Sequence, residues 1–449
     1  MAETENARSG GGGDLYAAWK SARDAAGADS WALSDLKTGR HWTFGDIQAT
    51  VDSLAPCDSG DIRFPVGYSV DLVFETLRAW RDGALLCPVE SEGSEPDATV
   101  FEGLPDETVH VKITSGSTGR PRLVRFLGPD LAADARKIVA TMGLRSEWPN
   151  LGVISMAHSY GFSSLVLPLL LHGIPLAWLG DPLPGAVGAA LTGSLKQGTG
   201  WTLPAVPAMW RAWLVAGVLS GDDLRLAISA GAPLPLELGH AVFDSTGMKI
   251  HNFLGSSECG GIAYDRSAVP RTSAESAGSA MEETSLVVNA EGCLEVHSPS
   301  VAAGYWPPEP EGAIGDGVFY TSDLAEIDPD SGEVKLQGRR DDLINVAGRK
   351  VSPVRVESAL AKHPEIACVL VFGVPSADAA RGDDIVAVYT GVGQTGDEEK
   401  LRRFAAETLA AHEIPRHWWP CPEVAPDARG KLSRTRWRER FLRERQGRT

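Results

Sequence analysis

Several features are scarce or absent in this chain of 449 residues, and each absence excludes a class of protein. Six cysteines are scattered without a CxxC pair, which argues against a disulfide framework or a zinc site. The ten histidines form no HExxH motif. The most apolar stretch, residues 165–179, is short and is interrupted by two prolines and a histidine, so it predicts a core helix and a strand, not a membrane span.

Basic residues are also in deficit. There are 42 Lys and Arg against 59 Asp and Glu, a net charge of −17, and this argues against a nucleic-acid partner. Residues 429–449 are a local exception, with nine basic residues against two glutamates, and they predict a solvated terminal helix. Residues 1–13 are polar and glycine-rich, which predicts a disordered tail and not a signal peptide. We therefore expect a cytoplasmic protein without a membrane partner.

Hydrophobic residues make up 43% of the chain, enough to bury a sizeable core. From residue 14 onward helical and strand patterns alternate, which is typical of an α/β fold with largely parallel sheets. Between about 285 and 338, short strands follow one another closely, among them residues 318–320 and 325–327. After residue 342 the pattern indicates a smaller α+β domain of about 100 residues. Ligands of parallel sheets bind at the carboxyl ends of the strands, so the loops there are the expected site.

One such loop is residues 114–122 (TSGSTGRPR), which follows an expected strand and ends in cations. Glycines let backbone N–H groups approach an anion, and Ser and Thr hydroxyls add donors, so the segment predicts a phosphate-binding loop. It lacks the GxxxxGK[ST] spacing of a P-loop. It also narrowly misses the GxSxG elbow of serine hydrolases, as does the segment 255–259. A serine nucleophile and a purely structural turn remain the alternatives.

The segment TSGSTGRPR resembles the phosphate loop of the adenylate-forming superfamily, which comprises acyl-CoA synthetases, adenylation domains and luciferases. Further segments resemble the other motifs of this superfamily and occur in the same order along the chain. They are residues 41–46 (HWTFGD), 80–88 (WRDGALLCP), 156–161 (MAHSYG), 229–234 (SAGAPL), 252–258 (NFLGSSE), 292–305 (GCLE to GY), 319–323 (FYTSD), 338–349 (GRRDDLINVAGR) and 426–431 (PDARGK). Thr43 in the first of them is a plausible helix cap. The motif style is closest to acyl-CoA synthetases.

The resemblance implies a large N-terminal body (residues 14–339) of parallel sheets and helices with a small β-barrel-like unit (about 285–338). It further implies a hinge at 340–341 around Asp341 and a small mobile α+β domain (342–449). The implied reaction joins a carboxylic acid to the α-phosphate of ATP with release of pyrophosphate, and then transfers the acyl group to a thiol. The implied cofactors are ATP and Mg²⁺, with coenzyme A as co-substrate.

The resemblance also implies which residues bind the nucleotide. Asp323 offers two acceptor oxygens to the ribose hydroxyls, with Arg339 beside it. Arg122 stands where relatives usually have Lys, and Leu254 where they often have an aromatic residue. The residues expected to contact ATP are Thr114, Ser115, Gly116, Ser117, Thr118, Gly119, Arg122, Ala230, Gly231, Ala232, Pro233, Phe253, Leu254, Gly255, Ser256, Ser257, Asp323 and Arg339.

Three residues are expected to take part in catalysis. Glu258 would hold Mg²⁺, a cation that prefers carboxylate oxygen, with a surface glutamate as the alternative. Lys431 would bridge the carboxylate and the α-phosphate as negative charge develops, although it also fits one more charge in a basic tail. His158 would line the acyl pocket and gate the thiol channel, and a packed core histidine is the competing interpretation.

The acid and its acceptor are left open. The expected pocket residues are His158, Tyr160, Phe162, Ser163, Val206 and Cys259. The loop of residues 157–162 lacks the Asp that pairs with an amino-acid ammonium in relatives, so a small aryl or medium-chain acid is favoured over a free α-amino acid. The acceptor is coenzyme A, an acyl carrier protein or a non-thiol group. A homologue that binds nucleotide without turnover is the remaining alternative.

Overall fold

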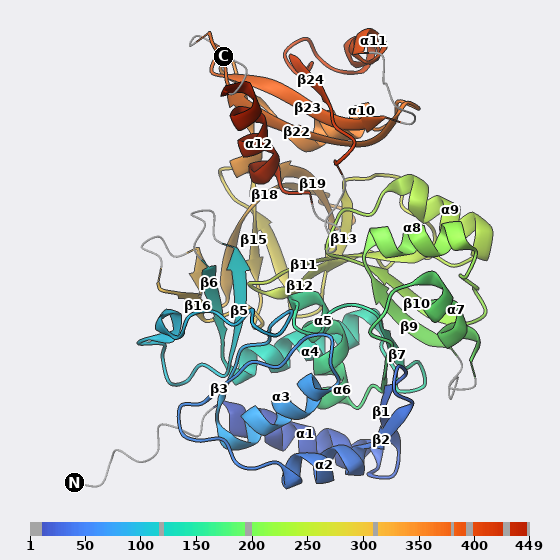
Figure 1. Ribbon diagram of the computed structural model, residues 1–449, viewed down its shortest axis with the longest axis vertical. Helices are drawn as coiled ribbons and strands as arrows, with labels where there is room; N and C mark the ends of the chain where they lie inside the picture. The colour runs from blue at the N-terminus through green and yellow to red at the C-terminus, as the bar shows by residue number, and fades with distance from the viewer. Residues whose placement is uncertain are drawn as a thin grey trace. The chain divides into compact units, whose positions relative to one another are not determined.

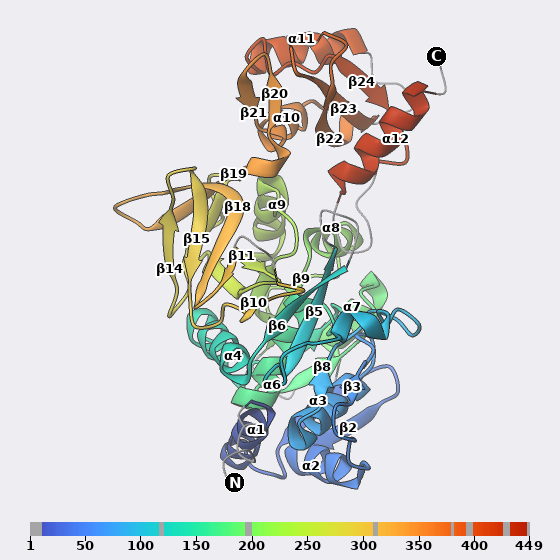
Figure 2. The ribbon, with the colours of Figure 1, turned by 90° about the vertical axis from the view of Figure 1, so that its left-hand side faces the viewer.

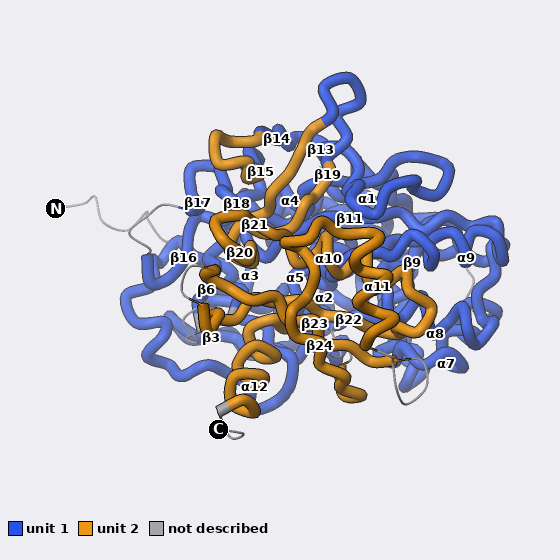
Figure 3. The backbone as a smooth tube through the Cα atoms, turned by 90° about the horizontal axis from the view of Figure 1, so that it is seen from above, with its two compact units in different colours: residues 1–287, 295–321, 328–334 blue, residues 288–294, 322–327, 335–449 orange. Residues whose placement is uncertain are grey.

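The computed structural model describes residues 11–115, 121–193, 200–308, 313–378, 381–391, 398–424 and 432–446. The molecule is a mixed α/β protein with a large N-terminal part and a smaller C-terminal part, as the sequence predicts. Its contacts divide it into unit 1, residues 1–287, 295–321 and 328–334, and unit 2, residues 288–294, 322–327 and 335–449 (Figure 3). The hinge expected at 340–341 lies inside unit 2 and stays a prediction.

The main sheet of unit 1 is built on parallel strands with helical crossovers (Figure 1). Pairing is parallel from β9 to β10, from β10 to β11, and among β7, β8 and β1, while β2 adds an antiparallel edge. Helices α8 (Pro207–Ala216) and α9 (Leu236–Thr246) connect β9, β10 and β11. The strands are β1 (Trp31–Asp35), β2 (Arg40–Thr43), β7 (Asn150–Gly152), β8 (Leu176–Trp178), β9 (Trp201–Ala205), β10 (Leu224–Ser229) and β11 (Ile250–Ser256).

A second sheet of unit 1 has the order β16-β6-β5-β4-β3. Its strands are β3 (Ile62–Arg63), β4 (Leu85–Leu86), β5 (His110–Ser115), β6 (Pro121–Phe126) and β16 (Gly304–Trp306). Figure 2 shows β5 and β6 running side by side, and their antiparallel register pairs Thr114 with Arg122. This hairpin therefore brings together the two ends of the predicted phosphate loop.

Local sequence explains where the N-terminal helices begin and end. These are α1 (Gly12–Ala26), α2 (Phe44–Ser53), α3 (Asp71–Asp82) and α4 (Gly128–Met142). Helix α2 begins with a capping box, since the Asp46 N–H donates to Thr43 Oγ1 at 3.0 Å and the Thr43 N–H donates to Asp46 Oδ2 at 2.9 Å. The predicted cap at Thr43 is confirmed. Gly83 ends α3 in the left-handed conformation at φ 73°, where a side chain would be strained.

The apolar stretch after residue 158 is not one regular helix. It begins as the short helix α5 (Ser159–Gly161), continues as a π-helical turn over Phe162–Val166, and ends as α6 (Leu167–His172). Such π-helical turns occur often at functional sites. Two more helical segments belong to unit 1. Helix α7 (Pro184–Thr192) follows β8, and a 3₁₀ turn (Ala98–Phe101) precedes β5. Among the described residues, no helix combines the length and apolar character needed to span a bilayer.

Short strands follow β11 closely, as expected. They are β12 (Gly260–Tyr264), β13 (Ser276–Ala280), β14 (Ser285–Val288), β15 (Cys293–His297), β17 (Ile314–Gly315), β18 (Val318–Ile327) and β19 (Glu333–Arg339). The two strands expected at 318–320 and 325–327 form the single strand β18, so their separation was wrong. Residues 321–324 between them continue the strand, with Thr321 buried and the next three residues half-buried.

Unit 2 contains a three-stranded sheet of β22 (Ile366–Pro375), β23 (Asp383–Gly391) and β24 (His417–Pro420). Pairing is antiparallel for β22 with β23 and parallel for β23 with β24. A hairpin, β20 (Ile344–Val346) with β21 (Arg349–Val351), precedes this sheet, and its remaining helices are α10 (Pro353–Leu360), α11 (Glu398–Thr408) and α12 (Arg434–Gln446). Strand β24 was not expected from the sequence, because four residues ending in proline carry little strand signal.

The core of unit 1 provides the first testable prediction. Leu33 lies in β1 between β2 and β8 with no exposed surface, and Leu33→Ala should lower the free energy of unfolding by about 2–5 kcal/mol. Val215 in α8 is 84% exposed, so Val215→Ala should change it by less than about 0.5 kcal/mol. Urea denaturation followed by tryptophan fluorescence measures both; equal losses would contradict the assignment of the core.

Candidate active site

The carboxyl ends of the parallel strands bring three predicted segments together. In the paired strands, Ser229 of β10 lies opposite Ala205 of β9 and Asn252 of β11. Val206 therefore begins one loop at this edge and Ala230 begins the next, while the third segment is the end of β11 from Phe253 to Ser256, beyond its pairing with β10. This edge is where ligands bind in open α/β sheets. The expected adenine wall and one expected pocket residue are thus neighbours.

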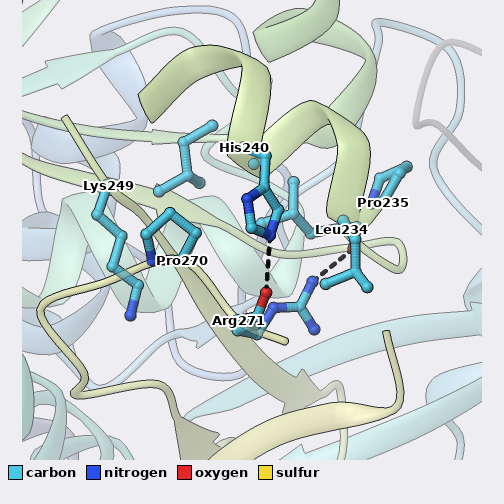
Figure 4. Close-up of a pocket in the computed structure, with 9 residues that line it drawn as sticks. Leu234, Pro235, His240, Lys249, Pro270 and Arg271 are labelled. Atoms are coloured by element: carbon cyan, nitrogen blue, oxygen red, sulfur yellow. Dashed lines mark hydrogen bonds between the residues drawn. The ribbon is translucent and has the colours of Figure 1, made fainter. Parts of the chain in front are cut away.

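The loop after β10 depends on a glycine. Gly231 has φ +83°, and a Cβ there would lie 3.3 Å from Val206 Cγ1. A side chain at this position would be strained and would crowd the neighbouring loop. Two hydrogen bonds also hold this loop (Figure 4). Arg271 Nη2 donates to Leu234 O at 2.5 Å, and His240 Nε2 donates to Arg271 O at 3.0 Å. No pattern in the sequence indicated this role for Arg271, which lies 37 residues from Leu234.

Tyr160 of α5 is held by its hydroxyl near the end of β10, and its ring lies near Phe253. The hydroxyl donates to Ile228 O at 3.3 Å, and burial raises the pKa of Tyr160 well above its usual range. Its ring centroid lies 5.9 Å from that of Phe253. A neutral, anchored phenol cannot act as a base, and the lining role expected for Tyr160 stays a prediction.

Phe162 and Ser163 are more deeply buried than Tyr160, whereas His158 is less buried. Phe162 is 1% exposed and stacks on His110 at 4.5 Å between ring centroids, and burial lowers the pKa of His110 well below its usual range. Ser163 is buried and donates to Asp134 Oδ2 at 2.6 Å. His158 is half-buried at the start of α5, where its Nδ1 accepts from the Tyr160 N–H at 3.3 Å. A lining role for these residues stays a prediction.

The turn between β11 and β12 carries Glu258. Its N–H donates to Ser256 Oγ at 3.1 Å, and its carbonyl accepts from the Ala302 N–H at 2.9 Å. Ser257 is bonded to the loop of α5, because Ser159 Oγ donates to Ser257 Oγ at 3.1 Å. The backbone on both sides of Glu258 is therefore held, and the turn is joined to the loop of residues 157–162.

A chain of side chains connects Glu258 with the phosphate-loop hairpin. Tyr305 of β16 donates its hydroxyl to Glu258 Oε1 at 3.1 Å. The guanidinium of Arg122 lies over the Tyr305 ring, 4.3 Å from its centroid. Strand β16 pairs with β6, which places Tyr305 beside Val124 and within reach of Arg122. Tyr305 is not among the site residues expected from the sequence, although it belongs to one of the recognised motifs.

The residues around Glu258 offer a single carboxylate to a Mg²⁺ ion. Among the residues that the structure describes, no group of three or more His, Cys, Asp or Glu side chains is placed to enclose a metal ion. Mg²⁺ is commonly held by one or two carboxylates together with substrate phosphates and water. A single half-buried glutamate beside the phosphate-loop hairpin suits that arrangement. Neighbouring Cys259 is fully buried, and burial raises the pKa of its thiol to about 12.

The phosphate loop is described only at its ends. Thr114 Oγ1 donates to Arg122 O at 3.4 Å, and Ser115 pairs with Pro121. Gly116, Ser117, Thr118 and Gly119 lie outside the described residues. Lys431 does as well. Their predicted roles rest on the sequence alone.

In unit 2, the two residues expected at the ribose lie together. Arg339 Nε is 3.3 Å from Asp323 Oδ1, and Arg339 Nη2 donates to Ser322 Oγ at 2.7 Å. They are separated by 16 residues along the chain and meet because β18, which contains Asp323, is the neighbour in the sheet of β19, which ends at Arg339. Asp341 follows in a 3₁₀ turn (Arg340–Asp342), exposed to solvent, with Arg340 Nε 3.8 Å from its Oδ1.

Comparisons with known proteins agree with this geometry. Residues 79–306, just over half of the chain, match the model of the family described as AMP-binding enzyme. Residues 355–431 match the AMP-binding enzyme C-terminal domain. The chain belongs to the AMP-binding enzyme family. The resemblance to the adenylate-forming superfamily is therefore confirmed.

Individual relatives are distant. The chain is similar to a long-chain-fatty-acid–CoA ligase of Bacillus subtilis, 26% identical over 73% of this chain and 60% of that protein. It is 27% identical to a probable 2-succinylbenzoate–CoA ligase of Mycobacterium tuberculosis over 85% of this chain and 98% of that one. Among solved structures, ATP-bound MatB from Rhodopseudomonas palustris superposes with a TM-score of 0.82 at 21% identity, over 96% of this chain and 99% of that chain. The last likeness establishes the shared fold.

The turn after Glu258 provides the second prediction. Gly260 has φ +66°, and a Cβ there would lie 2.0 Å from Asp134 Oδ1, so Gly260→Ala should lower the free energy of unfolding by about 2 kcal/mol or more. At Gly239 in α9 a Cβ would have no heavy atom within 4 Å, and Gly239→Ala should raise stability by up to about 1 kcal/mol. Urea titration of both variants measures the difference; the same sign for both would contradict this geometry.

Proposed function

We propose that the chain is an AMP-forming ligase that activates a carboxylic acid with ATP and transfers the acyl group to coenzyme A. In the first step a carboxylate oxygen of the acid bonds to the α-phosphorus of ATP. The bond from that phosphorus to the bridging oxygen breaks, and pyrophosphate leaves. In the second step the thiol sulfur bonds to the acyl carbon, AMP leaves, and the thiol proton passes to solvent.

The observation that carries this proposal is the chain of contacts from Arg122 through Tyr305 to Glu258. It brings a cation from the phosphate-loop hairpin and a carboxylate from the β11–β12 turn into one arrangement. Phosphoryl transfer needs such fixed charges around the phosphates rather than covalent help from the protein. A magnesium ion bound there would neutralise phosphate charge during the transfer. Glu258 would hold it, and Tyr305 would orient the carboxylate.

The remaining roles follow from the family. The Ala230–Pro233 loop would contact adenine, and Asp323 with Arg339 would bind the ribose hydroxyls. Ser257 would donate to the α-phosphate. Lys431 would bridge the acid and the α-phosphate in the first step, and rotation at Asp341 would expose another face for the thiol.

For the acid, we propose a small aryl or medium-chain acyl substrate. The Tyr160 and Phe253 rings and Val206 support an apolar pocket at the carboxyl edge of the sheet. The loop of residues 157–162 contains no carboxylate that could pair with an amino-acid ammonium group.

Acid-dependent ATP–pyrophosphate exchange across a panel of acids tests the first step. Lys431→Ala should lower the exchange rate by about 100-fold or more, since it removes the cation that neutralises the developing charge. Lys362→Ala, an exposed lysine of the same unit, is the control and should leave the rate unchanged. Unchanged exchange in Lys431→Ala would refute the catalytic assignment, and no exchange with any acid would favour a nucleotide-binding homologue without turnover.

The second step tests the hinge. Asp341→Pro limits rotation at the hinge residue, so we expect exchange to persist while thioester formation from a supplied acyl-adenylate becomes far slower. Asp341→Ala, which removes the carboxylate but keeps backbone freedom, should retain both steps. Loss of exchange with thioester formation intact in Asp341→Pro would contradict the assignment. Coenzyme A, a carrier protein and a simple amine are compared as acceptors in the same assay.

A further inference from the structure

Two charged side chains are buried together on one face of α4, and the proposed chemistry uses neither. Asp134 is 3% exposed and Lys137 is fully buried. Their spacing of three residues places them on the same side of the helix, with Lys137 Nζ 4.0 Å from Asp134 Oδ1. Buried charges are costly unless they are paired and hydrogen-bonded, so their partners indicate what they hold in place.

The ammonium of Lys137 is bonded to the backbone that follows Glu258. Lys137 Nζ donates to Cys259 O at 3.1 Å and to Gly261 O at 2.5 Å. Cys259 is the residue directly after Glu258, and the two carbonyls lie on either side of Gly260. The ammonium therefore holds the turn from which the Glu258 side chain projects.

The same ammonium reaches the segment that leads to Tyr305. Lys137 Nζ donates to Ser300 Oγ and, at 3.3 Å, to Ser298 Oγ. Ser300 Oγ in turn donates to Cys259 O at 2.7 Å. Two residues further on, the Ala302 N–H donates to Glu258 O at 2.9 Å. Lys137 thus connects both segments whose side chains meet in the hydrogen bond between Tyr305 and Glu258.

Asp134 extends the network toward the acid pocket. Its Oδ1 accepts from the Gly261 N–H at 3.1 Å, and its Oδ2 accepts from Ser163 Oγ at 2.6 Å. Ser163 belongs to the π-helical turn that follows the His158–Tyr160 loop. The buried pair on α4 therefore links the π-helical turn of residues 162–166 to the turn that carries Glu258.

We propose that Lys137 is a positioning residue for Glu258, which sets the orientation of that carboxylate toward magnesium-bound ATP without touching either. The inference rests on the proposed role of Glu258. Replacing a residue that orients a metal ligand without contacting the metal typically lowers metal affinity or activity by about 10- to 100-fold. The direct consequence concerns the magnesium dependence of nucleotide binding.

The test uses the full chain with Lys137→Met, which keeps the length of the side chain and removes its charge and donors. Isothermal titration calorimetry with ATP is carried out over a series of free Mg²⁺ concentrations, and urea denaturation is measured in parallel. We expect the Mg²⁺ concentration for half-maximal ATP affinity to rise by about tenfold or more. ATP affinity without Mg²⁺ should change little.

A second buried lysine is the matched control. Lys249 is bonded to Asp265 at 2.7 Å, with both side chains under 10% exposed, and its ammonium also donates to Ser267 O at 2.6 Å. These partners lie beyond the Glu258 turn, in the segment after β12. Lys249→Met should destabilise unit 1 as well, but it should leave the Mg²⁺ dependence unchanged. An equal shift in both variants, or none in a folded Lys137→Met, would overturn the proposal.

If Lys137→Met does not fold, Ser300→Ala decides. It removes one acceptor of the ammonium and the donor to Cys259 O, and a smaller shift of the same direction is expected; no shift would overturn the proposal.

ATP–pyrophosphate exchange distinguishes a failure of the proposed ligase function from a failure of the proposed role of Lys137. Magnesium-dependent ATP binding that responds to Lys137, without exchange on any acid, would refute the ligase function and leave the positioning role standing.

Discussion

The turn between β11 and β12 is the constraint on which the site depends. It places Glu258 between two backbone hydrogen bonds, one to Ser256 and one from Ala302, and it tolerates no side chain at Gly260 because Asp134 occupies that space. Since β11 pairs in parallel with β10, the same strand also sets the position of the loop after β10, the candidate adenine wall. One strand thereby relates the candidate metal carboxylate to the candidate nucleotide wall.

The second sheet supplies a positive charge, Arg122, which is connected through Tyr305 with the Glu258 carboxylate. Its β5–β6 hairpin brings Arg122 against the Tyr305 ring, and β16 holds Tyr305 in register beside β6. Tyr305 lies 183 residues after Arg122 along the chain, so their contact exists only once β16 has paired with β6. This long-range origin explains why the tyrosine, unlike the glycines of the loop, was not assigned a role from sequence.

The local elements were the most predictable part of the fold. The capping box of Thr43 and Asp46, the end of α3 at Gly83 and strand β10 all follow from short-range patterns. The division of β18 into two strands was wrong, and β24 was missed. In both cases pairing partners, rather than local propensity, decide the structure, because a strand gains its hydrogen bonds from its neighbours.

The sequence by itself determined the family, the reaction type that the family implies and most of the candidate nucleotide contacts, because motifs report residue types at given spacings. The meeting of Asp323 with Arg339 was anticipated in this way, and the structure brings the two to 3.3 Å. Only the tertiary structure decided what surrounds Glu258. In the sequence, Asp134 and Lys137 look like an ordinary pair of charged residues one helical turn apart. Their hydrogen-bond partners Ser163, Cys259 and Ser300 become neighbours only when α4 packs against the Glu258 turn. Burial and hydrogen bonding are properties of the folded chain, and no local pattern contains them.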